Sequence, residues 1–179
     1  MARRSLILAA ALLLAAGCGE AVRSGAEAGP WPGRLHRLPP WRTGVPALAV
    51  NVPEEYEKGL RAGEGFMVHL FRRPPEKAPA DSATLAVYVG RHPREPRTKT
   101  LAEPGRIAGR AVTWFGDTWR ESDGRQMYHA EAYVRGLFAW PRCWKPEAQG
   151  LIVHVMAWGT DQKEVERLMA AAESLRLTP

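Results

Sequence analysis

This chain of 179 residues lacks the short motifs that mark many catalytic sites. It contains no Gly-x-Ser-x-Gly nucleophile turn, no closely spaced cysteine pair, no glycine-rich phosphate loop and no His-Glu-x-x-His zinc motif. Each of these motifs holds a nucleophile, a metal or a phosphate in a defined geometry, so their absence argues against the corresponding enzyme classes. The sequence therefore predicts a protein that is not an enzyme and that has no cofactor.

Clustered positive charge and cysteine are also scarce. The formal net charge is +6, but no run of Lys and Arg is longer than two residues. A nucleic-acid-binding surface usually gathers its basic residues on one face, so we do not expect nucleic acid as a partner. Only two cysteines occur, Cys18 and Cys143.

The N-terminus does contain the three parts of an export signal. Arg3-Arg4 is a positively charged start, Leu6–Leu14 is an apolar run, and Ala15-Ala16-Gly17 is a small-residue approach to a cleavage point. The apolar run is much shorter than the roughly 20 residues that are needed to span a bilayer. Residues 1–17 are therefore predicted to be a signal peptide.

Leu12–Cys18 resembles the lipobox of bacterial lipoproteins, with Ala15 at a position where that family favours leucine. The resemblance implies that the Cys18 thiol carries a diacylglycerol. Two or three acyl chains make a durable membrane anchor, because each buried methylene contributes roughly 0.8 kcal/mol. Gly19 follows Cys18, and by analogy with the family this favours the periplasmic side of the outer membrane. The alternative is an ordinary secretory signal in which Cys18 is incidental.

Residues 18–44 are rich in Gly, Pro, Ala and Arg and show no sustained apolar period. Pro30, Pro32, Pro39 and Pro40 disfavour a regular helix and favour extended backbone. We therefore predict a semi-rigid spacer over 18–44 that holds a single domain, residues 45–179, away from the membrane.

The domain sequence alternates between apolar and polar residues over several short stretches, which is typical of β-strands. A short helical turn is expected over 54–58, a long polar connection over 92–105, and an Asp-Gly hairpin turn over 122–125. The most apolar stretch, 151–158, is predicted to be the central strand. The expected strands are 47–52, 65–72, 84–90, 111–116 with a continuation beyond Gly116, 125–134 and 151–158.

An amphipathic helix is predicted at the C-terminus. Thr160 or Asp161 is the expected N-cap, and Glu164 completes a capping-box pattern with Asp161. Apolar residues then recur at helical spacing on one face, from Val165 to Leu175. Successive strands without intervening helices imply an antiparallel sheet, so the predicted class is α+β, with this helix packed on one face of the sheet.

This order of elements, closing with an amphipathic helix that ends Glu173-Ser-Leu175, is similar to the PsbP and Mog type of α/β/α sandwich, which includes bacterial lipoproteins of the DcrB kind. The resemblance implies a protein that binds another envelope protein or acts in assembly. Immunity lipoproteins that neutralise antibacterial toxins end in a similar helix, so toxin immunity is an alternative.

Met and His recur in pairs two residues apart on three predicted strands. Two-residue spacing puts both side chains of a pair on the same face of a strand. If the three strands adjoin, thioethers and imidazoles converge on one face, and this set suits copper or another metal. A second layer over that face would produce the same pattern. The pairs are Met67 with His69, Met127 with His129, and His154 with Met156.

A second candidate surface is the aromatic segment Trp140–Trp144. Trp and Arg are over-represented at binding hot spots, so Trp140, Arg142 and Trp144 form a protein-docking patch if their loop is exposed. The alternative is that they cover the sheet edge as part of the core. Cys143 lies in this segment and has no partner in the chain if Cys18 is lipidated; we interpret it as a small buried apolar residue.

Overall fold

The computed structural model of the protein describes residues 32–40, 42–43, 45–74, 76, 83–94, 101–138 and 150–178. Within these ranges the chain forms ten β-strands and one α-helix. In chain order they are β1 (Gly33–Leu38), β2 (Ala47–Pro53), β3 (Glu57–Gly63), β4 (Phe66–Arg72), β5 (Ala83–Gly90), β6 (Leu101–Ile107), β7 (Arg110–Arg120), β8 (Gln126–Val134), β9 (Ile152–Gly159), α1 (Gln162–Glu173) and β10 (Arg176–Thr178).

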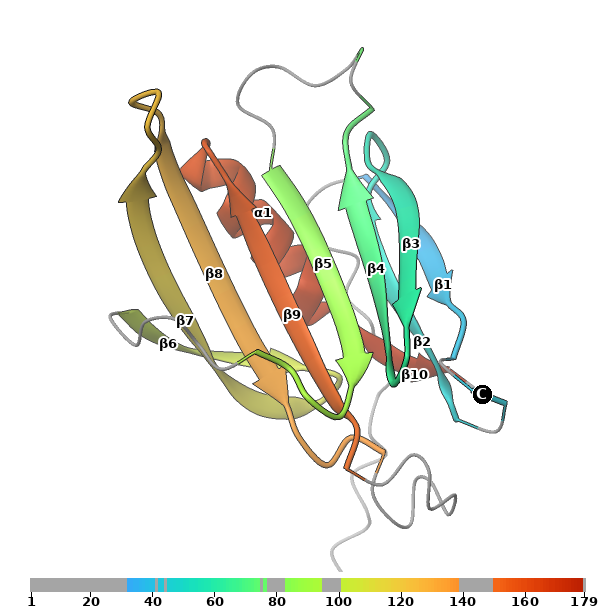
Figure 1. The fold of residues 1–179 in the computed structure, drawn as a ribbon. Helices are drawn as coiled ribbons and strands as arrows, with labels where there is room; N and C mark the ends of the chain where they lie inside the picture. The colour runs from blue at the N-terminus through green and yellow to red at the C-terminus, as the bar shows by residue number, and fades with distance from the viewer. Residues whose placement is uncertain are drawn as a thin grey trace, which may run out of the picture.

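Seven strands form one large antiparallel sheet in the order β3-β4-β5-β9-β8-β7-β6 (Figure 1). The last of these strands in the chain, β9, inserts between β5 and β8 and so joins two sets of hairpins. Six of its eight residues are buried. The prediction that the apolar segment 151–158 is the central strand is confirmed.

The predicted hairpin turn between β7 and β8 is also confirmed. The Glu121 N–H donates to the Arg125 carbonyl at 2.9 Å, and the Gly124 N–H donates to the Glu121 carbonyl at 2.9 Å. Gly124 has a φ of +87°, a conformation that suits glycine because it has no Cβ.

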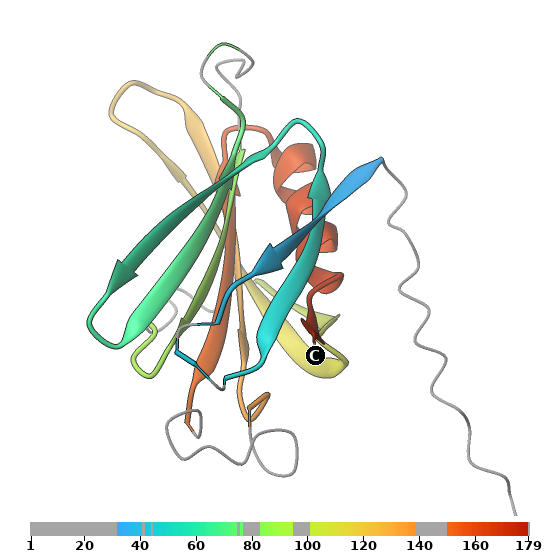
Figure 2. The ribbon, with the colours of Figure 1, turned by 90° about the vertical axis from the view of Figure 1, so that its right-hand side faces the viewer.

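A smaller sheet of three strands lies beside α1, on the same side of the large sheet (Figure 2). Its order is β1-β2-β10, with both neighbours antiparallel to β2. The His36 ring on β1 meets the Phe71 ring on β4 at a centroid distance of 5.1 Å, which ties the two sheets together. β1 pairs with β2 over its whole length, so the stretch that we predicted to be a spacer contains a strand.

The helix α1 packs its apolar stripe against β2, β5, β8 and β9. Val165, Leu168, Ala171 and Ala172 are buried on this stripe. Asp161 is the N-cap, since its Oδ1 accepts the Lys163 N–H at 2.9 Å. These features confirm the predicted helix and its cap. Among the described residues, no helix is long and apolar enough to cross a membrane.

Glu164 serves a different purpose from the capping box that we predicted. Its Oε1 accepts hydrogen bonds from the Tyr56 hydroxyl at 2.8 Å, from Arg73 at 2.8 Å and from Arg167 at 3.1 Å. Glu55 accepts from the same two arginines. This network ties the turn between β2 and β3 and the end of β4 to the first turn of α1.

The predicted α+β class is wrong, because the protein is mainly β. Strands take 60% of the described residues and helix takes 11%, in two antiparallel sheets with one helix. The part of the prediction that placed a C-terminal helix on one face of the sheet agrees with the structure. An α/β/α sandwich requires helices on both faces, whereas the described residues place a single helix on one face.

The error arose at strands with little or no buried face. All seven residues of β3 are exposed, and they include residues that we assigned to a helical turn. β6 replaces most of the second half of the predicted connection 92–105, and its sequence includes Pro104. Both lie at edges of the large sheet, where no alternation of burial is imposed on the sequence.

Candidate functional site

One face of the large sheet is not covered by any described helix or strand, and we call it the uncovered face (Figure 1). A row of rings runs across four of its strands. The rings of Phe66 and Tyr88 stack at a centroid distance of 5.8 Å, Tyr88 meets His154 edge-on at 6.4 Å, and His154 stacks on Tyr133 at 4.1 Å. Such cross-strand ring pairs stabilise a sheet and leave aromatic surface available on its outer side.

A buried polar network lies at the end of this row. The Glu131 carboxylate and the His154 imidazole lie 2.7 Å apart (Oε2 to Nε2), with 5% and 2% of the two residues exposed. The Tyr133 hydroxyl lies 2.8 Å from the same Glu131 oxygen and 2.6 Å from the Arg94 carbonyl. Tyr133 therefore links the segment after β5 to the uncovered face.

The network favours the ionised form of Glu131. Burial alone raises the pKa of a carboxyl group, but the hydrogen bonds with His154 and Tyr133 outweigh it and lower the pKa of Glu131 below its usual value. A charge buried in this way is compensated by its partners.

Beside the network is a hollow of about 530 Å³ on the uncovered face, which we call the face hollow. Its apolar wall consists of Trp119, Met156 and Trp158. Its polar residues include Asp117, His129 and Glu131. Large aromatic side chains around a hollow with a few polar groups are typical of binding surfaces.

The structure brings together two of the three predicted Met-His pairs. Met127, His129, His154 and Met156 lie on adjacent strands, with His129 opposite Trp158 and Met156 opposite Glu131. Met67 and His69 do not join them. Their strand, β4, is separated from β9 by β5, and His69 points into the core with 1% of the residue exposed.

A metal site therefore cannot be built from all six residues as we envisaged. Within the described ranges, no three or more His, Cys, Asp and Glu side chains are grouped so that they could hold a metal ion. His154 is instead engaged with Glu131 and stacked on Tyr133.

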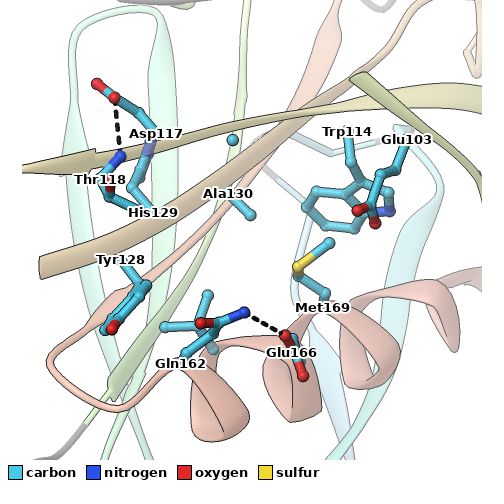
Figure 3. A pocket seen from close by; sticks show the side chains of 12 residues that line it. Glu103, Trp114, Asp117, Thr118, Tyr128, His129, Ala130, Gln162, Glu166 and Met169 are labelled. Atoms are coloured by element: carbon cyan, nitrogen blue, oxygen red, sulfur yellow. Dashed lines mark hydrogen bonds between the residues drawn. The ribbon is translucent and has the colours of Figure 1, made fainter. Parts of the chain in front are cut away.

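A second hollow lies on the opposite face of the same sheet, between α1 and the strands β7 and β8 (Figure 3). We call it the helix groove; its volume is about 320 Å³. Ala130, Val165 and Met169 form its apolar floor together with the rings of Trp114 and Tyr128. Asp117 and His129, which pair across β7 and β8, border both hollows, but their side chains lie on the uncovered face, where the His129 ring meets the Trp119 ring at 6.2 Å.

Trp114 is the most firmly held residue of the helix groove. Only 3% of it is exposed, and its indole N–H donates to Glu173 Oε1 at 3.2 Å. The ring lies over Gly105, where an added Cβ would come within 2.6 Å of the indole Cδ1. Glycine at this position of β6 therefore leaves room for the indole ring, and the hydrogen bond to Glu173 at the end of α1 fixes the orientation of the ring.

The rim of the helix groove is acidic. Glu103 and Glu166 line it with their carboxylates, and the described lining residues include neither Lys nor Arg. Gln162 Nε2 donates to Glu166 Oε1 at 2.9 Å, which restricts that carboxylate to the side of the groove (Figure 3).

Several predicted site residues lie outside the described residues. These are the lipidation candidate Cys18, the unpaired Cys143, and the candidate docking residues Trp140, Arg142 and Trp144.

Sequence reasoning missed Glu131, Tyr133 and Trp114 as site residues. The alternation along β8 placed Glu131 and Tyr133 on the same face as His129, so a buried acid beside a histidine was visible in the pattern. For Trp114 no comparable signal exists, because its position depends on the pairing of β6 with β7.

No protein-family model matches this chain, and no curated protein matches it either.

Proposed function

We propose that this protein is a lipid-anchored protein of the bacterial cell envelope that binds another envelope protein through the uncovered face of its large sheet. The location depends on one observation, the lipobox-like stretch Leu12–Cys18 that follows a charged and apolar start. The role is that of a non-catalytic binding or assembly module at the periplasmic side of the outer membrane.

The position of the first strand fits such an anchor. Residues 19–32, a stretch of 14, separate the lipidated residue from β1 at Gly33. A chain of this length reaches at most about 50 Å when fully extended. An anchored domain would therefore stay close to the membrane surface, within reach of other membrane-bound proteins.

The residues of the uncovered face support the binding role. Phe66, Tyr88, Tyr133, Met156 and Trp158 are all partly exposed there, whereas the apolar residues of the opposite face are buried under α1 and the small sheet. Tyr and Trp dominate binding hot spots because they bring large contact areas at a small cost in conformational entropy. A contiguous aromatic surface of this kind marks an interaction site more often than an ordinary solvated surface.

The anchor can be tested by mass spectrometry and membrane fractionation of the full chain expressed in a bacterial host. We expect an acylated N-terminal fragment beginning at Cys18 and recovery of the protein with outer membranes. The Cys18→Ser variant should be neither acylated nor cleaved at this point. An unmodified thiol at Cys18, or the intact product in the cytosol, would contradict the proposed location.

The binding face can be tested by placing a photo-crosslinking amino acid at one position at a time in intact cells. At Trp158, on the uncovered face, we expect a discrete crosslinked product. At Ala170, exposed on α1, we expect none. The crosslinked protein should also co-purify with the unmodified chain and be lost in Trp158→Ala. Identical products from both positions would refute the uncovered face as the binding surface.

A further inference from the structure

The helix groove lies on the other face of the sheet from the surface proposed to bind a partner, so that role does not explain it. Its volume of about 320 Å³ falls at the lower end of the range of small-molecule pockets, which is roughly 300–1,000 Å³. Its floor is built from Trp114, Val165 and Met169, which leaves an apolar surface of the size of a small ring or a short alkyl chain.

The charge of the rim favours one class of ligand. The chain as a whole has an excess of basic residues, with a formal net charge of +6. The described residues around the groove reverse this balance, with the carboxylates of Glu103 and Glu166 and no Lys or Arg. Among the ion pairs of the described residues, none includes Glu103 or Glu166.

The geometry places the acidic and apolar groups within one ligand's reach. Figure 3 shows the Met169 side chain between Glu103, beside Trp114, and Glu166 on the helix. The carboxylates of Glu103 and Glu166 attract a cation, while Trp114 and Met169 offer apolar contact to the rest of the ligand. An anion would be repelled, and a neutral molecule of the same shape would gain only the apolar contact.

We propose that the helix groove binds a small organic cation, an amine or guanidine with an apolar body, with the body against Trp114 and Met169 and the charge toward Glu103 and Glu166. This site is distinct from the proposed partner-binding face and does not depend on it.

Three probes that share a phenyl ring but differ in charge test the proposal. They are the cation 2-phenylethylamine, the neutral 2-phenylethanol and the anion phenylacetate. Each is titrated into the full chain in non-ionic detergent micelles, with micelles alone as the blank. The readout is calorimetry together with the NMR signals of the indole N–H groups, in which Trp114 is assigned from Trp114→Phe. We expect the amine to bind at least about 5-fold more tightly than the alcohol and the acid not to bind, with the Trp114 signal shifting most.

The carboxylates are tested with Glu103→Gln and Glu166→Gln, both at exposed positions. Each variant should weaken amine binding by about 2- to 5-fold at low salt, the range of an exposed ion pair, and leave alcohol binding unchanged. The matched control is Glu57→Gln on β3, at the far edge of the sheet, which should leave both affinities unchanged.

Two results would overturn the proposal. One is equal binding of all three probes, or no binding of the amine at millimolar concentration. The other is amine binding that shifts the signals of Trp119 or Trp158 in place of Trp114, since those residues belong to the face hollow. Neither result bears on the lipid anchor or on the crosslinking at Trp158, so the two proposals can fail separately.

Discussion

Acid destabilisation of this protein should depend strongly on one histidine, His69. Its ring is buried between β4 and the segment 38–40, with 1% of the residue exposed, and its Nδ1 has no hydrogen-bond partner. Burial, together with the positive charge of Lys58, lowers the pKa of His69 to about 4, although a hydrogen bond to the Pro39 backbone acts in the opposite direction. The folded protein therefore keeps this ring neutral at a pH at which the unfolded chain protonates it.

The sign and size of the effect follow from the two pKa values. Between the unfolded value of about 6.5 and the folded value of about 4, the unfolded chain binds more protons, so stability falls as the pH is lowered. A pH of 5 lies about 1.5 units below the pKa of His69 in the unfolded chain, whereas the His69 ring of the folded protein is still mostly neutral at this pH. At about 1.36 kcal/mol per unit, His69 should cost about 2 kcal/mol of unfolding free energy between pH 7 and pH 5.

Urea denaturation at pH 7, 6 and 5 measures this cost in the wild type, in His69→Gln and in His92→Gln. Residue 92 is exposed, so His92→Gln should retain the full loss of stability on acidification. His69→Gln should lose about 2 kcal/mol less than the wild type over the same interval, whatever its stability at pH 7. His36, whose pKa is also lowered by burial, is present in all three proteins and cancels in the comparison. Equal losses in the wild type and His69→Gln would refute the reasoning.

Three further predictions can be checked by the same urea measurements at pH 7. Gly105→Ala should lower the unfolding free energy by about 2–3 kcal/mol, because the new methyl group meets the buried Trp114, whereas the control Gly59→Ala meets only ordinary contacts at 3.8 Å and should stay within about 1 kcal/mol of the wild type. Leu168→Ala, at a fully buried position of α1, should cost about 2–5 kcal/mol by leaving a cavity between the helix and the sheet. Asp161→Ala should cost about 1 kcal/mol by removing the N-cap of α1, and an unchanged stability would show that the Lys163 N–H finds another acceptor.

The elements that the sequence predicted correctly are those in which one face is buried. β4, β5, β8 and β9 have buried apolar residues on the face toward α1, and their alternation was therefore visible. The helix α1 was predicted for the same reason, with a buried stripe and an aspartate at its N-cap. In each case the apolar periodicity of the sequence results from the burial of one face of the element.

The elements that were missed are stabilised mainly by pairing with a neighbouring strand. β1 exposes three of its six residues, and its hydrogen bonds go to β2, which is adjacent in space but separated by a proline-rich segment. Its prolines at 39 and 40 follow the strand without interrupting it. We predicted a spacer because prolines favour extended backbone. A β-strand is also extended, so the prolines do not distinguish between the two.

The candidate sites were partly predictable for a similar reason. A period of two places His129, Glu131 and Tyr133 on one face of β8, but it does not say which strand lies next to that face. The pairing of β8 with β9 brings Tyr133 opposite His154 and so creates the network with Glu131. His69 does not reach this network, because β5 lies between β4 and β9 and the His69 side chain points into the core.

Two glycines show how this sheet holds aromatic rings in a fixed orientation. Gly90 and Gly105 lie within β5 and β6, and each sits under a ring: Tyr88 folds over Gly90, and Trp114 lies over Gly105. Glycine weakens a strand because it has no side chain to pack, and a ring laid over it buries the exposed backbone and restores that packing. The ring is in turn restricted to one orientation, because a side chain at the glycine position would displace it. The Tyr88 ring on the uncovered face and the Trp114 ring of the helix groove are therefore held by the strands themselves, and the partly exposed Tyr88 remains available to a partner.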